Sequence, residues 1–117
     1  MAKKLILSNN QHIAVLCIKD IVYFETNLGH ITVHYMENDD MAEFTFDGTL
    51  KSLESRLKGY GFIRIHRCYL AALDRICRLD SHWVGLSDKK KTRLPIGETY
   101  AASVRAAIMN EDAEIFP

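Results

Sequence analysis

Long apolar runs are missing from this sequence, and none approaches the roughly 20 residues that a membrane-spanning helix needs. The N-terminal segment contains two lysines but only one short apolar run, residues 5–7, which is too short for a secretory signal peptide. We therefore expect no membrane insertion and a cytoplasmic location.

Cysteine is also scarce, with three residues, Cys17, Cys68 and Cys77, and no CxxC spacing. An odd, scattered set excludes a disulfide framework and a zinc finger, so we expect buried free thiols. The acidic run at residues 37–40 lacks the length, the glycine and the terminal glutamate of a calcium loop. We therefore expect neither a metal nor a cofactor.

Catalytic motifs are absent as well. The five histidines are scattered, and the sequence has no nucleophile motif, no glycine-rich phosphate loop and no paired-carboxylate site. His66, between Arg64 and Arg67, is the most catalytic in character, but its alternation with Ile65 favours a structural role. We expect a protein that is not an enzyme.

Net charge is zero, but the charges are segregated along the chain. Residues 56–93 contain ten basic and three acidic side chains, whereas the remainder contains five basic and twelve acidic ones. Zero net charge argues against a nucleic-acid partner, whereas this segregation indicates a basic region on a neutral molecule.

The 117 residues suffice for a single domain, whose core we place at about residues 4–109. Apolar residues at alternate positions indicate strands, and spacing near 3.6 residues indicates helices. The expected fold is mainly β, with short antiparallel sheets, one short helix at about residues 48–58 and a C-terminal helix at about residues 99–109. Outside the central stretch described below, the expected strands are 4–8, 12–18, 21–25, 31–35, 41–46, 76–79, 83–86 and 92–96.

Local signals add detail to these elements. Both faces of residues 12–18 are apolar, which predicts burial on both sides, and Asn9 and Asn10 are expected to form the preceding turn through left-handed backbone angles. Residues 26–30 are expected to be a loop. Asp47 or Thr49 is expected to cap the first helix.

Residues 62–76 form the central stretch, in which apolar residues alternate with cations. Such alternation predicts a half-buried strand with one wet side. That side carries Arg64, His66 and Arg67, so the segment can support a core and present positive charge to a polyanion.

The central stretch resembles the signature of the LytTR family of bacterial DNA-binding domains. The matching residues are Phe62, Arg64, His66, Arg67, Tyr69, Leu70, Leu73 and Ile76. Cys68 replaces the usual serine, and Ala71 and Ala72 replace the usual Val-Asn pair. Flanking matches at residues 20–25, 49–54 and 94–96 extend the resemblance over about residues 4–109. We expect a stand-alone domain without a receiver domain.

The resemblance implies a sequence-specific transcriptional regulator that inserts loops into successive major grooves of double-stranded DNA at a direct-repeat site. Two copies would bind as a homodimer or in tandem, and a protein regulator is a further implied partner. Arg67 would read guanine. His30 would read a base edge or is only a polar loop residue, and the three lysines would contact phosphate or form only a solubilising turn. The candidate DNA-binding residues are Asn27, His30, Arg64, His66, Arg67, Lys89, Lys90, Lys91, Arg93 and Thr99.

One segment departs from the family pattern. After the Leu-Pro-Ile run the family has Ser-Arg-Arg-Tyr, whereas this chain has Gly97, Glu98, Thr99 and Tyr100. Two positive charges are replaced by a carboxylate that phosphate repels. The alternative reading is therefore a protein-interaction module that modulates a partner regulator and has lost DNA binding.

Overall fold

The structure is a computed structural model that describes residues 3–110 and 114–115. Its strands are β1 (Lys4–Ser8), β2 (Ile13–Cys17), β3 (Ile21–Asn27), β4 (His30–Glu37), β5 (Asp40–Asp47), β6 (Phe62–His66), β7 (Tyr69–Ala72), β8 (Ile76–Leu79), β9 (Trp83–Leu86) and β10 (Arg93–Pro95). Its α-helices are α1 (Leu50–Arg56) and α2 (Ala101–Met109). Three short 3-10 turns complete the order: η1 (Ile18–Asp20), η2 (Leu73–Arg75) and η3 (Glu98–Tyr100).

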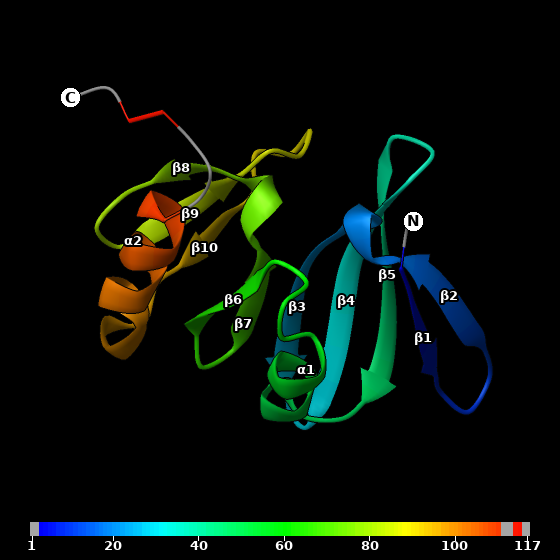
Figure 1. Cartoon of the computed structure of the whole chain (residues 1–117). Coiled ribbons are helices and arrows are strands. Elements are labelled where there is room, and N and C mark those ends of the chain that lie inside the picture. The colour runs from blue at the N-terminus through cyan, green and yellow to red at the C-terminus, as the bar shows by residue number, and fades with distance from the viewer. Residues whose placement is uncertain (1–2, 111–113, 116–117) are drawn as a thin grey trace.

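The strands form three antiparallel sheets (Figure 1). The β1–β2 hairpin stands alone, the central sheet has the order β5-β4-β3-β7-β6, and the third sheet has the order β10-β9-β8. These sheets and the two helices confirm the expected fold class, which is mainly β.

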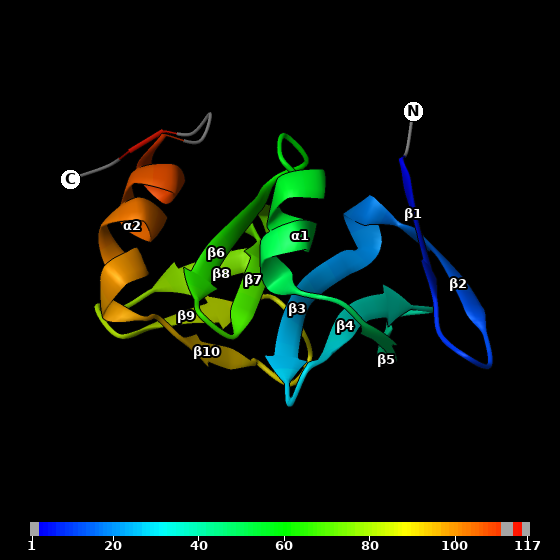
Figure 2. The same cartoon turned by 90° about the horizontal axis from the view of Figure 1, so that it is seen from below.

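The central sheet lies between two layers (Figure 2). On one side, Leu50, Leu53 and Leu57 at α1 and residues of the β1–β2 hairpin pack against it in one buried cluster. On the other side, the β8–β10 sheet and Val104 of α2 form a second cluster. The sheet is therefore covered on both faces over much of its area, which fixes the position of its strand ends.

Strand β3 contributes to both clusters, which explains its run of four buried residues. Ile21 and Phe24 belong to the first cluster, and Val22 and Tyr23 belong to the second. Strict alternation would not give this division, but the pairing with β4 shifts register between Ile21 and Tyr23. Phe24 is completely buried, and β3 is the strand around which both cores are built.

Helix α1 follows from local sequence. The Thr49 side chain accepts a hydrogen bond from the Ser52 backbone N–H at 3.1 Å, so Thr49 is the cap, one of the two expected. The helix spans Leu50–Arg56, shorter than the predicted 48–58, because the backbone has already left helical geometry at Leu57. At the other end of the chain, η3 and α2 together occupy the predicted 99–109 region, beginning one residue earlier.

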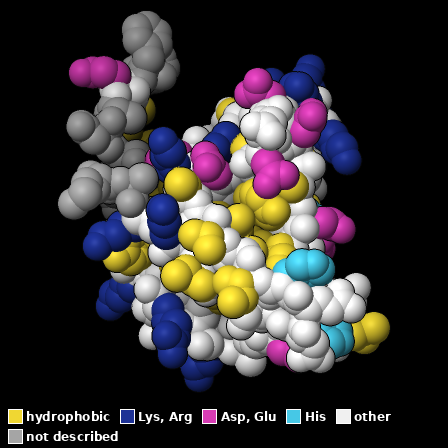
Figure 3. Space-filling model, turned by 90° about the vertical axis from the view of Figure 1, so that its right-hand side faces the viewer, with side chains coloured by type: hydrophobic (Ala, Val, Ile, Leu, Met, Phe, Trp, Pro, Cys, Tyr) yellow, Lys and Arg dark blue, Asp and Glu magenta, His cyan; other side chains and the backbone are white. Residues whose placement is uncertain are grey.

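The prediction that both faces of residues 12–18 are buried is wrong. Leu16 is buried, but Ile13 and Val15 are 69% and 56% exposed, and Ile6 on β1 is 67% exposed. Ile6 pairs with Val15, so these side chains share the outer face of a two-stranded sheet that is covered on its inner side alone. Figure 3, which faces this hairpin, shows hydrophobic side chains gathered on the surface.

This difference in burial gives a stability prediction. Leu16→Ala leaves a cavity under the hairpin and is expected to lower the free energy of unfolding by about 2–4 kcal/mol. Val15→Thr on the outer face is expected to change it by less than about 0.5 kcal/mol. Urea unfolding of both variants measures the contrast, and an equal cost at the two positions would mean that the outer face is covered in solution.

Two turn predictions also need correction. Asn9 forms its turn through its side chain and not through a left-handed backbone. Its Oδ1 accepts hydrogen bonds from the backbone N–H groups of Gln11 and His12, both at 2.9 Å.

The predicted loop at 26–30 is a tight two-residue turn instead. Strands β3 and β4 extend to Asn27 and His30, which pair, and Leu28 and Gly29 take positive φ angles of 53° and 83°.

The expectation of buried thiols holds in part. Cys17 and Cys68 are half-buried, but Cys77 is exposed. Cys77 lies where the β8–β9 pairing shifts register, between Ile76 and Arg78, on an edge strand of the small sheet. The irregular pairing leaves this side chain outside the second core.

Candidate nucleic-acid interface

Arg64 holds the turn between β6 and β7 in one shape. Its Nε donates to the His66 carbonyl at 2.9 Å, and its Nη2 donates to the Arg67 carbonyl at 2.6 Å. Its Nη1 contacts Glu54 of α1 at 3.1 Å, and the guanidinium lies 5.8 Å from the centre of the Tyr100 ring. The side chain is only 15% exposed, so its donors serve the fold and are not presented to solvent.

The His66 side chain also forms a hydrogen bond within this turn. Its Nδ1 accepts a hydrogen bond from the Cys68 backbone N–H at 3.0 Å, and its ring lies 5.5 Å from that of Tyr69. An Nδ1 that accepts carries no proton, so this geometry fits a neutral imidazole with its proton on Nε2. The structural reading of His66, reached from its strand phase, agrees with these contacts.

Backbone hydrogen bonds join the β6–β7 turn to segments on either side of it. The Thr26 N–H, at the end of β3, donates to the Cys68 carbonyl at 3.0 Å. The Gly97 N–H, after β10, donates to the Ile65 carbonyl at 2.9 Å. A Cβ on Gly97 would meet the Tyr100 ring at 3.1 Å, so glycine at this position lets Tyr100 of η3 pack closely against it. Three segments distant in sequence therefore lie side by side.

The β3–β4 hairpin brings Asn27 and His30 to its tip. His30 Nδ1 lies 2.7 Å from an oxygen of Asp47, and both side chains are well exposed. Leu28, between them, is 92% exposed in a left-handed conformation that is unfavourable for a residue with a Cβ. This apolar tip was not singled out from sequence, because its exposure depends on the tight turn.

The lysines occupy the tip between β9 and β10. Asp88 is buried and organises this tip, since its two carboxylate oxygens accept hydrogen bonds from the Thr92 N–H and hydroxyl at 2.8 and 2.6 Å. Lys91 takes a positive φ of 52° and its N–H donates to the Asp88 carbonyl. Lys89 lies 3.7 Å from Asp40 at the β4–β5 tip, an exposed pair that contributes little stability.

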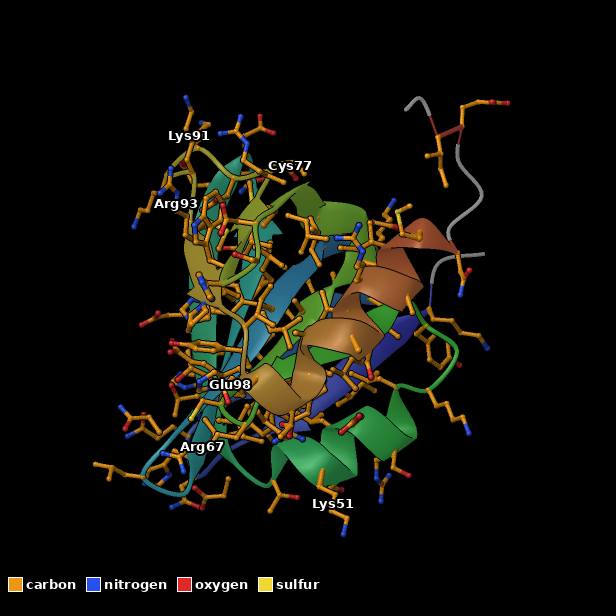
Figure 4. All side chains as sticks on the ribbon, turned by 90° about the vertical axis from the view of Figure 1, so that its left-hand side faces the viewer. Lys51, Arg67, Cys77, Lys91, Arg93 and Glu98 are labelled. Carbon is orange, nitrogen blue, oxygen red and sulfur yellow. The ribbon has the colours of Figure 1, made fainter. Side chains whose placement is uncertain are left out.

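One edge of the molecule collects most of the predicted site. In Figure 4, Lys91 and Arg93 lie at its upper end, Glu98 in its middle and Arg67 at its lower end. Thr99 follows Glu98 in η3, which contacts β6. We call this edge, which carries Lys91, Arg93 and Arg67, the cationic edge. The carboxylate of Glu98 lies between Arg93 and Arg67 along it.

Two tyrosines behind the turn, Tyr69 and Tyr23, have raised pKa values. Burial raises the pKa of Tyr69 above its ordinary value, and the negative charge of Glu25 raises it further. Burial raises the pKa of Tyr23 more strongly, again with Glu25 adding to the effect. Both phenols therefore stay protonated up to a higher pH than an exposed tyrosine does.

Other kinds of site find no support in the part of the chain that the structure describes. Within residues 3–110 and 114–115, no three His, Cys, Asp or Glu side chains are grouped so that they could hold a metal ion. The helices among these residues are also too short or too polar to cross a membrane.

Comparison with known proteins identifies the family of the chain. A family model described as the LytTr DNA-binding domain matches residues 11–109. The sensory transduction proteins LytT of Bacillus subtilis and Bacillus cereus are each 29% identical to the chain in an alignment of 105 residues. The alignments cover 87% of this chain but only 42% and 41% of those proteins. The chain thus spans about two fifths of these relatives.

A solved structure supports the fold independently. A LytTr DNA-binding domain from Bacillus cereus superposes with a TM-score of 0.73, covering 90% of this chain and 95% of that one at 20% identity. With the family model extending from Gln11 to Met109, nearly all of the elements described above are accounted for. The chain belongs to the LytTR family of DNA-binding domains.

Proposed function

We propose that this chain is a sequence-specific transcriptional regulator that inserts the β3–β4 tip and the β6–β7 turn into successive major grooves of a direct-repeat site. The observation that carries the proposal is a pair of backbone hydrogen bonds, from Thr26 to Cys68 in the β6–β7 turn and from Gly97 to Ile65 near the end of β6. These bonds fix the turn beside the end of β3 and beside the segment after β10. A rigid array of this kind can address more than one groove without reorganising.

The side chains at this edge divide into readers and positioning residues. Arg67 is exposed, has no acceptor for its guanidinium among the described residues, and suits bidentate recognition of guanine. Asn27 and His30 would contact base edges, and Leu28 suits the methyl group of thymine. Lys89, Lys90, Lys91, Arg93 and Thr99 would contact phosphate.

Arg64 and His66 take a different role in this proposal from the one first expected. Their polar atoms bond to the turn that presents Arg67, so they would act on DNA through Arg67 and not by contact. Positioning by a half-buried arginine is consistent with its low exposure.

The alternative function, a protein-interaction module that has lost DNA binding, draws support from two carboxylates. Glu98 lies within the cationic edge, and Asp47 lies against the candidate base reader His30. Both would repel phosphate when ionised. The chain, as one domain, would then modulate a partner regulator through this edge.

Fluorescence anisotropy of the whole chain with labelled duplexes decides between the two functions. We expect binding to a pool of direct-repeat duplexes that weakens steeply between about 50 and 200 mM salt, as counterion release requires. Absence of binding at the lower salt concentration would contradict the DNA-binding proposal and favour the protein-interaction alternative.

Replacement of Glu98 tests whether its charge limits affinity. Glu98→Arg is expected to tighten DNA binding about tenfold at low salt and to steepen the salt dependence by about one counterion, because one repulsion becomes one phosphate contact. Asp74→Asn in η2 removes a negative charge away from the edge and serves as the control. An equal gain in the control would show that only net charge matters.

A further inference from the structure

The outer face of the β8–β10 sheet has a glycine at its centre with an arginine on each side. Gly85 on β9 pairs with Arg78 on β8 and with Arg93 on β10, so the three positions share one face. The other face of the sheet carries Val84, which is completely buried in the second core. A glycine in the interior of a central strand often marks close approach by a ligand or another backbone.

A pocket of about 290 Å³ opens over this glycine. Trp83 forms one wall, and the Arg93 guanidinium lies 4.2 Å from the centre of its ring. A Cβ on Gly85 would meet the Arg78 Cβ at 3.2 Å and the Trp83 ring at 3.3 Å, so any other residue would crowd the floor. Lys91 also lines the pocket and brings a third positive charge.

The tip that supplies Lys91 is held in a strained shape. Lys91 has a positive φ of 52°, a conformation that costs a residue with a Cβ free energy that glycine would not lose. Buried Asp88, which also lines the pocket, keeps the tip in place through its bonds to Thr92. Backbone strain of this kind occurs in tight turns, as at Leu28, and also clusters at ligand-binding sites.

We propose that this pocket is a phosphate-binding site formed by Arg78, Lys91 and Arg93 over the floor of Gly85. Three cations against one buried carboxylate leave the pocket positively charged. Guanidinium groups present forked donors that match phosphate oxygens, and the stacked Arg93 is already oriented. The volume suits a phosphate group with part of its sugar and is small for a whole nucleotide.

The phosphate comes from one of two sources with the same chemistry. If the ligand is a backbone phosphate of DNA, the DNA-contacting surface extends beyond Arg93 to Arg78. This possibility rests on the proposed function. A free phosphate ester would make the pocket an effector site, and this possibility is independent of DNA binding. Arg78 is the residue that distinguishes the pocket, since it was not among the predicted DNA contacts.

Trp83 is the single tryptophan of the chain, so its fluorescence reports on this pocket directly. We expect its emission to change when the whole protein is titrated with a direct-repeat duplex. Titration with inorganic pyrophosphate is expected to give a similar change at higher concentration. Arg78→Gln is expected to weaken DNA binding three- to tenfold at about 100 mM salt and to lower the salt slope by about one.

Lys51→Gln is the matched control, because it removes one exposed positive charge from α1, away from the edge that carries Lys91 and Arg93 (Figure 4). It is expected to leave both the Trp83 signal and the salt slope unchanged. Circular dichroism of Arg78→Gln checks that the sheet is intact, since a charge loss on an exposed side chain should not unfold it.

The outcomes separate this inference from the proposed function. The pocket proposal would be overturned if DNA binding saturates by anisotropy without a change in Trp83 emission and Arg78→Gln binds DNA as the unchanged protein does. DNA binding itself would then be established. A Trp83 response to pyrophosphate that Arg78→Gln abolishes, with no binding to DNA, would support the site with a soluble ligand and contradict the proposed function. No response to either probe would overturn the site.

Discussion

Arg64→Ala is expected to lower the free energy of unfolding by about 2–4 kcal/mol, because two carbonyl groups at the β6–β7 turn lose charged donors. The contact with Glu54 should add little, since that carboxylate is about half exposed. DNA affinity is expected to fall more than tenfold, because Arg67 loses the turn that presents it. Urea unfolding and anisotropy on the same samples measure the two effects.

Arg64→Lys separates charge from geometry. Lysine keeps the positive charge but has a single ammonium in place of the guanidinium fork, so it cannot serve both carbonyls and Glu54 in the same arrangement. A lysine variant that loses most of the stability and affinity supports a positioning role. Full affinity with lost stability would show that the shape of the turn is unimportant for DNA.

Arg67→Ala, unlike Arg64→Ala, is expected to lower DNA affinity while leaving the free energy of unfolding nearly unchanged. Its side chain is exposed at the lower end of the edge in Figure 4, so truncation removes little packing. Affinity for the specific site is expected to fall by about 1–3 kcal/mol, the value of one bidentate base contact, with a smaller loss on random DNA. Anisotropy with both duplexes gives the difference.

Arg56→Ala is the control for this change, because it removes an exposed arginine from the end of α1. It should reduce binding to both duplexes slightly and equally. An equal loss on specific and random DNA for Arg67→Ala itself would contradict base reading and assign Arg67 to phosphate. Together, the variants at Arg64 and Arg67 test whether one arginine holds the β6–β7 turn in shape while the other binds DNA.

Much of the fold follows from patterns that a sequence shows directly. Strand positions come from alternation, and the cap of α1 comes from a threonine whose hydroxyl lies within reach of a nearby N–H. The charge segregation and the signature around Arg67 likewise need no coordinates. The alternation, the cap and the signature are local, since each depends on residues within a few positions of one another. The charge segregation is a count over residues 56–93 that needs no tertiary contact.

Burial was harder to predict where it depends on distant segments. Residues 12–18 have two apolar faces, yet Val15 is exposed because no layer covers the outer side of the hairpin. Cys77 is exposed because β8 is an edge strand with irregular pairing. An apolar pattern states which residues can be buried, but the arrangement of layers decides which ones are.

The element types, the antiparallel class and the family follow from the amino-acid sequence, because periodicity and motif spacing are properties of the linear chain. That Arg64 supports the turn while Arg67 is exposed became visible in the folded structure, since the two arginines differ in the acceptors near them. The fold also placed Glu98 within the cationic edge and set Arg78, Gly85 and Arg93 side by side on three strands. Availability of a charged group depends on its partners. Arg64 finds two acceptors in the folded β6–β7 turn and a third, Glu54, on α1, whereas the guanidinium of Arg67 has no acceptor among the described residues.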